Sequence, residues 1–234
     1  MIATASARMG LPYNARMFIG HFAAGLAGRR LTPTVSLAVW FLAVQLLDVL
    51  WPFFVLAGIE HVRIDPGNTA FTPLDFTDYP VSHSLVGALI WATLFAGGWM
   101  LRRGRSAAAW LLFMGVVSHW VLDVISHRSD VPVLPHGPYL GLGLWNSVPL
   151  TLLVESSMFA AAIVFYARGL KPRVSFWILM AVLFALYLAA AFGPPPPSVT
   201  ALAWTSIAGL FIMPWAWWAD RRAGGWSEKL GARS

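Results

Sequence analysis

The chain contains a series of apolar runs, each close to the length that crosses a bilayer. A transmembrane helix needs about 20 apolar residues in succession. The runs are Val35–Gly58, Val81–Leu101, Ala107–Ile125, Val148–Ala167, Ser175–Phe192 and Val199–Ala219. Each is expected to be a helix, because a lone segment in lipid can satisfy its backbone hydrogen bonds in no other way. A shorter segment, about Ala15–Ala27, precedes them and is a short span, a tilted helix or a re-entrant piece.

The composition extends this expectation to the whole chain. Of its 234 residues, 58% are hydrophobic and 11% are charged, whereas soluble domains carry about 25% charged residues. Such a shortage of charge leaves no stretch for a separate soluble domain. We therefore expect residues 1–234 to form a single integral membrane domain. Its fold class is all-α: a polytopic transmembrane helical bundle with six long spans and a short N-terminal helix. Residues 1–14 lack the apolar core of a signal peptide.

The basic residues are placed like topology signals. They stand in short groups beside the apolar runs: Arg29-Arg30, Arg102–Arg105, Arg168–Arg173 and Arg221-Arg222. If the six runs alternate across the membrane, all four groups fall on one side, which the positive-inside rule makes cytoplasmic. Charge dispersed in this way argues against a nucleic-acid partner, despite a net charge of +6. We expect a bacterial inner (cytoplasmic) membrane protein with a cytoplasmic C-terminus.

The other side of the membrane receives the connections Glu60–Pro80, Ser126–Ser147 and Pro194–Pro197. The N-terminus lies on that side if the short first segment crosses, and inside if it is re-entrant. The loop residues expected to be solvated are Glu60, His61, Asp65, Asp75 and Asp78. His136 is expected in a turn, and Asp130 is expected to anchor its loop.

Ionisable residues inside membrane spans are costly and usually face a cavity or a partner. In this chain they share one depth, because the topology places each of them in or beside the outer half of the membrane. They are His21, Asp48, His83, His119, Asp123, His127 and Glu155. The topology rests on arginine and lysine alone, so the shared depth is an independent indication of a common site.

An H-x3-D-x3-H pattern suggests the chemistry of that site. His119, Asp123 and His127 are spaced by four residues, which puts them on one helical face. Asp48 and His83 are the best candidates for further ligands. Imidazole and carboxylate groups together bind a divalent ion such as zinc, and water on such an ion loses a proton near neutral pH. Thiolate ligands are excluded, because the chain has no cysteine.

Other interpretations of the same residues remain open. A single intramembrane histidine such as His21 often only bonds to a neighbouring helix. Asp48 and His119 would suit an ion pair between helices. A proton-coupled transporter or permease would use the same Asp, His and Glu residues as a relay. A non-catalytic membrane scaffold could hold a structural metal.

Several short motifs resemble those of a known family. They are Gly20-His21, Leu47-Asp48, Ser82-His83-Ser84-Leu85 and Ser118-His119-Trp120-Val121-Leu122-Asp123. They resemble the YdjM-like (DUF457) family, whose members are described as membrane-bound metal-dependent hydrolases. The resemblance covers about Gly20 to Glu155, and the later helices carry no recognisable motif.

The ligand order is also distantly similar to that of the zinc-dependent phospholipase C and P1-type nuclease group. That likeness implies one metal held by Asp48, His83, His119 and Asp123. It further implies that Asp123 bridges to a second metal near His21, while His127 and Glu155 approach a third position. The chain departs from the pattern at Thr151, where the group has a histidine, and at Met1, where it has a tryptophan. We therefore expect one or two ions, with zinc as the expected metal.

The resulting prediction is a membrane-embedded metal-dependent hydrolase. It would cleave a phosphoester of a lipid or lipid-linked substrate at the outer face of the membrane by metal-activated water. A site at that depth meets lipid headgroups first. Asp48, Asp123 and Glu155 are the predicted catalytic carboxylates. The loop Ser126–Ser147 is predicted to border the entrance.

Overall fold

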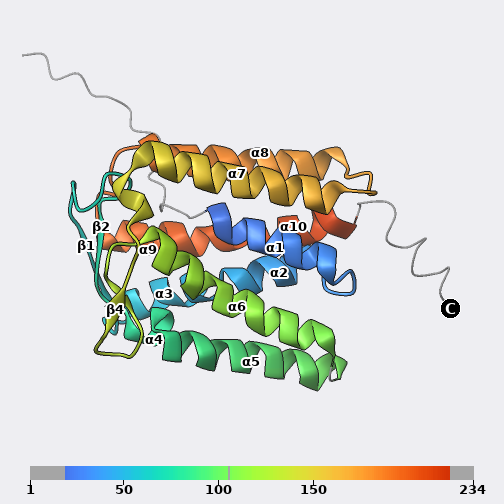
Figure 1. Ribbon diagram of the computed structural model, residues 1–234, viewed down its shortest axis with the longest axis horizontal. Helices are drawn as coiled ribbons and strands as arrows, with labels where there is room; N and C mark the ends of the chain where they lie inside the picture. The colour runs from blue at the N-terminus through green and yellow to red at the C-terminus, as the bar shows by residue number, and fades with distance from the viewer. Residues whose placement is uncertain (1–18, 105, 222–234) are drawn as a thin grey trace, which may run out of the picture.

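The computed structural model describes residues 19–104 and 106–221. Within them the chain forms a helical bundle in three tiers (Figure 1). The helices are α1 Ile19–Leu31, α2 Leu37–Val44, α3 Leu46–Leu56, α4 Pro80–His83, α5 Leu85–Arg103, α6 Ala107–Ser126, α7 Val148–Ala167, α8 Val174–Phe192, α9 Val199–Ala208 and α10 Ile212–Arg221. The α7–α8 hairpin forms one outer tier and the α5–α6 hairpin the other, with α1, α2 and α10 between them. The expected helical bundle is confirmed.

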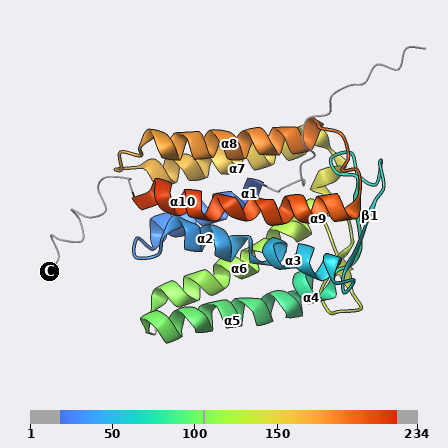
Figure 2. The same ribbon diagram turned by 180° about the vertical axis from the view of Figure 1, so that it is seen from behind.

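In the part of the chain that the structure describes, five helices are long and apolar enough to cross a membrane: α5, α6, α7, α8 and the continuous stretch Val199–Asp220. That stretch joins α9 to α10 through a single 3-10 turn and runs along the back of the bundle (Figure 2). The sixth expected span, Val35–Gly58, is not one straight helix. It divides at Gln45 into α2 and α3, which are bent by 54° relative to each other. The apolar run continues through the bend, so its length alone could not show the break.

Helix α1 is the centre of the bundle. Its 13 residues span about 20 Å, which is less than the roughly 30 Å hydrocarbon core of a bilayer. It runs from the middle of the bundle to one end and packs against α2, α6 and α7 (Figure 1). Gly28 permits this packing, because a Cβ there would lie 2.3 Å from the Trp40 ring. Of the expected segment Ala15–Ala27, residues 15–18 lie outside the described residues, and the helix continues to Leu31.

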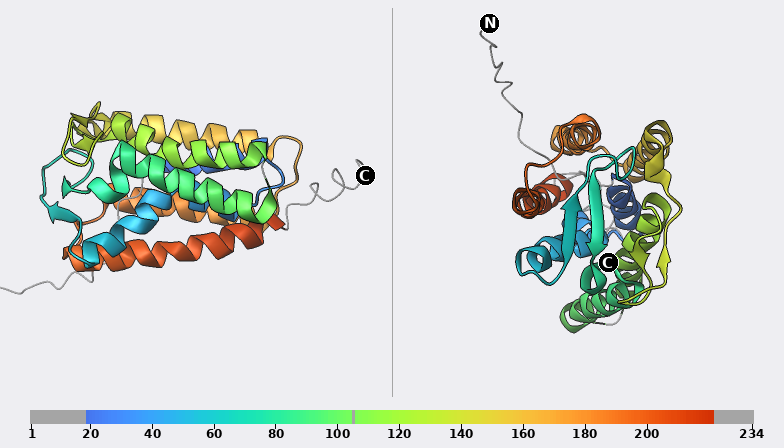
Figure 3. Two further views of the ribbon diagram at one scale, coloured as in Figure 1. Left: turned by 90° about the horizontal axis from the view of Figure 1, so that it is seen from below. Right: turned by 90° about the vertical axis from the view of Figure 1, so that its left-hand side faces the viewer.

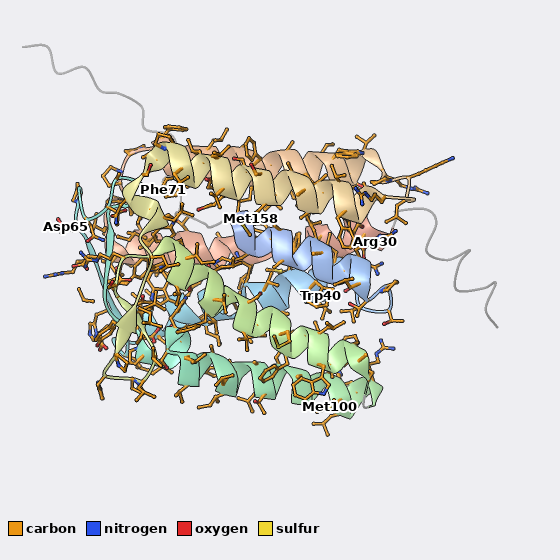
Figure 4. All side chains as sticks on the ribbon, viewed as in Figure 1. Arg30, Trp40, Asp65, Phe71, Met100 and Met158 are labelled. Carbon is orange, nitrogen blue, oxygen red and sulfur yellow. The ribbon has the colours of Figure 1, made fainter. Side chains whose placement is uncertain are left out.

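The two ends of the bundle differ in character. We call one end of the bundle the basic end. It contains the last turns of α1 and α5, the α7–α8 connection and the end of α10 (Figure 1). Figure 4 shows Arg30 and Met100 there, with Asp65 and Phe71 at the opposite end. The grouping of basic segments expected from the sequence is therefore present, apart from Arg105 and Arg222, which lie outside the described residues.

The opposite end, the strand end, carries two short hairpins that the sequence did not predict (Figure 3). They pair β1 (His61–Ile64) with β2 (Leu74–Asp78), and β3 (Val131–Pro132) with β4 (Tyr139–Leu140). The exposed His136 lies in the β3–β4 connection, in keeping with a turn residue.

The expectation that Glu60 and Asp75 are solvated is wrong, since both side chains are buried. The β1–β2 hairpin turns Asp75 inward, where it forms ion pairs with Arg63 at 2.6 Å and with Arg128. Asp65 is exposed, as expected.

Candidate metal centre

Five of the seven predicted site residues meet in the half of the bundle toward the strand end. His21 lies in the first turn of α1, Asp48 in the first turn of α3, and His83 ends α4. His119 and Asp123 lie about 18 Å and 24 Å along α6 from its start at the basic end, as judged from the rise of a helix. The bend between α2 and α3 therefore places Asp48 beside two residues of α6 that are distant in sequence.

Four nitrogen and oxygen atoms converge at the centre of this cluster. His83 Nε2 lies 3.4 Å from Asp48 Oδ1 and 3.8 Å from Asp123 Oδ2. His119 Nε2 lies 3.7 Å and 3.4 Å from the same two oxygens. Ligands about 2.0–2.1 Å from a tetrahedral zinc ion would be about 3.3–3.4 Å apart. The four nitrogen–oxygen distances, 3.4–3.8 Å, are thus equal to or slightly wider than that ligand spacing.

His21 adds a fifth group on the far side of Asp123. Its Nε2 lies 3.3 Å from Asp123 Oδ1, the carboxylate oxygen that does not face His83 and His119. The His21 and His119 rings are stacked, with centroids 3.8 Å apart. The ligand atoms fall into two triplets that could each hold an ion: His21, Asp48 and His119, and His83, His119 and Asp123. Asp123 belongs to the second triplet and directs Oδ2 toward His83 and His119 and Oδ1 toward His21.

The His83 ring is oriented by a hydrogen-bond chain from the strand end. Ser82 Oγ lies 2.6 Å from His83 Nδ1 and donates at 2.6 Å to Glu60 Oε2. A hydroxyl has one proton, so Ser82 must accept from His83 Nδ1–H. Glu60 is itself held by the backbone N–H groups of Val81 and Ser82. The chain holds the His83 ring with Nε2 directed into the cluster.

The His119 ring is oriented by the bend between α2 and α3. Its Nδ1 lies 2.7 Å from the carbonyl oxygen of Val44, the last residue of α2. A carbonyl can only accept, so Nδ1 carries the proton and Nε2 is a lone-pair donor. Metal-binding histidines are normally fixed in this way, through a bond from the second ring nitrogen to a carbonyl or carboxylate.

His127 and Glu155 belong to neither triplet among the described residues. His127 Nδ1 lies 3.1 Å from Asp130 Oδ1, and its ring lies 4.3 Å from the Trp145 ring. Trp145 Nε1 donates to Glu155 Oε1 at 3.3 Å. Trp145 therefore separates the two residues, in an arrangement that the H-x3-D-x3-H pattern did not anticipate.

Tyr79 completes the surroundings of His127. Its hydroxyl lies 3.4 Å from Asp130 Oδ1 and 3.5 Å from His127 Nδ1. Burial raises the pKa of Tyr79 well above its ordinary value, and the nearby carboxylate of Asp130 raises it further. The hydroxyl thus stays protonated and can donate to Asp130, which anchors this loop as expected.

The burial of the cluster tests whether its residues fit a cation. His119 Nε2 and Asp123 Oδ2 are both buried and make no hydrogen bond to any residue that the structure describes. Buried polar atoms without partners are rare and costly. A divalent cation between them would satisfy both atoms and offset the charge of two carboxylates.

Access to the cluster comes through Asp48, whose side chain is 39% exposed, whereas those of His83 and Asp123 are 5% and 4% exposed. Asp48 lines a partly open cavity of about 360 Å³. The rest of the lining is mainly apolar and comes from α3, β2, α8, α9 and α10. Comparison with protein-family models, curated proteins and solved structures returns no match for this chain.

The sequence did not identify the groups that orient the imidazoles. Glu60 lies more than 20 positions before the histidine that it helps to hold, and the Val44 carbonyl belongs to the backbone. Ser82 stands within the Ser-His-Ser-Leu motif, which was the one available signal. Trp145 had none.

Proposed function

We propose that this protein is a membrane-embedded metal-dependent hydrolase that acts on a phosphoester of a lipid or lipid-linked substrate. The observation that carries the proposal is the convergence of His83 Nε2, His119 Nε2, Asp48 Oδ1 and Asp123 Oδ2 at 3.4–3.8 Å. The orientation of both imidazoles supports it, since each Nδ1 proton is directed away from the cluster. The resemblance to the YdjM-like family points the same way.

Each residue has a distinct part in the proposal. Asp48, His83, His119 and Asp123 would hold one zinc ion, and His21 with the second oxygen of Asp123 would serve a second ion. A zinc ion held there would lower the pKa of water and stabilise charge on a phosphoryl oxygen. Asp48 is the ligand that an incoming substrate meets, because it alone borders the cavity.

His127 and Glu155 act indirectly in this proposal. Each contacts Trp145: the His127 ring packs against the Trp145 ring, and Glu155 accepts from Trp145 Nε1. We therefore assign Glu155, one of the three predicted catalytic carboxylates, a positioning role through Trp145.

The orientation in the membrane is part of the same proposal. The basic end would face the cytoplasm under the positive-inside rule, and the strand end with the site would face outward. In a bacterial inner membrane this would place the site at the depth of the outer leaflet, where its substrate would be a membrane lipid or a lipid-linked molecule.

The test combines metal analysis with hydrolysis. Protein purified in detergent with zinc should carry one or two ions by elemental analysis, located at these residues in an anomalous diffraction map. It should release phosphate or a phosphorylated headgroup from phosphatidic acid or phosphatidylglycerol vesicles.

Asp123→Ala should lose both metal binding and hydrolysis, and Asp65→Ala, in the exposed hairpin turn, should lose neither. Hydrolysis that survives Asp123→Ala would show the site to be misassigned. If no transition metal binds, the hydrolase proposal fails, and a proton relay in a transporter becomes the better interpretation of these Asp, His and Glu residues.

A further inference from the structure

The cavity beside Asp48 has a polar corner and an apolar body. Gln45, Asp48 and Trp51 line the corner, spaced by three residues along the bend and α3, so they share a face. The body is lined by Val182 and Leu186 of α8 and by residues of α9 and α10 such as Leu202 and Ile212. Such a division matches the two parts of an amphiphilic molecule.

The polar corner holds hydrogen-bonding atoms that have no partner. Gln45 and Trp51 are only 4% and 5% exposed. Gln45 Oε1 and Trp51 Nε1 are buried and make no hydrogen bond among the described residues. Leaving a buried donor or acceptor unpaired costs about 1–3 kcal/mol. The hydroxyls of Thr205 and Ser206, in the same lining, donate to backbone carbonyls of their own helix. The unpaired atoms are therefore confined to the corner next to Asp48.

The position of the cavity indicates where its occupant comes from. Val182 and Leu186 lie near the middle of the span formed by α8, and the other wall belongs to the span Val199–Asp220. The cavity thus lies at the depth of lipid chains and reaches inward to the metal cluster. Its volume of about 360 Å³ is near the lower limit of ligand pockets, roughly 300–1,000 Å³. That space suits one hydrocarbon chain rather than a whole two-chain lipid.

We propose that this cavity binds one acyl chain of a membrane phospholipid, with the ester and headgroup oxygens of the lipid at Gln45 and Trp51. Trp51 Nε1–H donates to a lipid oxygen, and the amide of Gln45 bonds to the neighbouring polar group. The phosphoester is thereby brought to Asp48. Only the fate of the bound lipid rests on the proposed hydrolase; the chain site itself stands on the cavity and its unpaired atoms. It gives α8, α9 and α10, which carry no recognisable motif, the role of selecting the substrate chain.

The experiment is photo-crosslinking in nanodiscs of phosphatidylethanolamine that carries a diazirine on one acyl chain. In the wild-type protein, cross-links should concentrate on cavity-lining residues such as Val182 and Leu202. Val182→Trp should fill the cavity and reduce this labelling roughly ten-fold, the effect of about 1.4 kcal/mol. Ala185→Trp, an exposed α8 position outside the cavity lining, should leave it unchanged. Trp51→Phe keeps most of the ring and removes one donor, so it should reduce labelling roughly five-fold.

Zinc content, measured on the same samples, separates this proposal from the hydrolase. Unchanged labelling of the lining residues in Val182→Trp, or equal labelling of the whole lipid-facing surface in the wild type, would overturn the chain site even if zinc binds. Cavity labelling in a protein that binds no zinc would support the chain site and count against the hydrolase. If Val182→Trp fails to fold, Ser206→Leu fills the same cavity from α9 and should reduce the labelling in the same way.

Discussion

Two buried carboxylates of this protein, Asp220 and Asp123, have opposite surroundings. Near the basic end, Arg29 Nε donates to both oxygens of Asp220 at 2.9 Å. Tyr166 and the backbone N–H of Leu37 donate to the same carboxylate at 2.9 Å and 3.0 Å. Near the strand end, Asp123 Oδ2 makes no hydrogen bond within the described ranges 19–104 and 106–221, although His119 Nε2 is 3.4 Å away. Both oxygens of Asp220 accept hydrogen bonds, whereas Asp123 pairs with His21 through Oδ1 and leaves Oδ2 without a partner among the described residues.

The difference separates a self-contained ion-pair cluster from the candidate metal centre. The Asp220 cluster joins α1, α2, α7 and α10 and balances one negative charge with one positive charge. The Asp123 cluster joins α1, α3, α4 and α6 and gathers two carboxylates and three imidazoles. Buried polar atoms without partners are costly, and a cation between them would satisfy them. Among the described residues the first cluster is fully hydrogen-bonded, whereas the second leaves His119 Nε2 and Asp123 Oδ2 without a partner.

The largest expected effect comes from breaking the Asp220 cluster. Asp220→Asn removes the negative charge that Asp220 supplies to the buried Arg29 guanidinium, and breaking a buried ion pair typically costs about 3–5 kcal/mol. Unfolding in mixed detergent–SDS micelles, followed by circular dichroism, should show this loss. The folded fraction should still bind zinc, because the metal cluster is untouched. A loss below about 1 kcal/mol, the range of exposed ion pairs, would mean that the cluster is not structural.

The matching change at the other cluster should have the opposite character. Without metal, Asp123→Asn should leave the free energy of unfolding within about 1 kcal/mol of the wild-type value, because it removes one of two poorly compensated carboxylates. With zinc at about 1,000 times its dissociation constant, the wild type should gain about 4 kcal/mol and the variant nothing. The measurement is the unfolding midpoint with and without zinc. A variant that unfolds as easily as Asp220→Asn in the absence of metal would show that Asp123 is structural after all.

The sequence could predict the helical bundle and five residues that meet in the candidate site, but not the geometry of that site. The length of an apolar run can be seen in one stretch of sequence. So can an ionisable residue within it, such as His119 or Asp123. The bend at Gln45 depends on how α2 and α3 pack against different neighbours. The burial of Glu60 depends on the β1–β2 hairpin, and no apolar run in the sequence indicates that hairpin. Residues called solvated from their charge alone were therefore the least reliable part of the prediction.

The smallest of these effects concerns the groups that orient the ligands. Ser82→Ala removes the oxygen that accepts from His83 Nδ1–H and cuts the link to Glu60. Losses of such partners typically weaken metal binding about 10–100-fold. Zinc affinity measured by chelator competition should fall by that factor, and Ser82→Thr, which keeps the hydroxyl, should restore most of it. Stability without metal should fall far less than in Asp220→Asn, because Ser82 carries no charge. If Ser82→Ala leaves zinc affinity unchanged, His83 does not depend on this chain for its orientation. The contrast between the two carboxylates would then rest on His119 and the Val44 carbonyl alone.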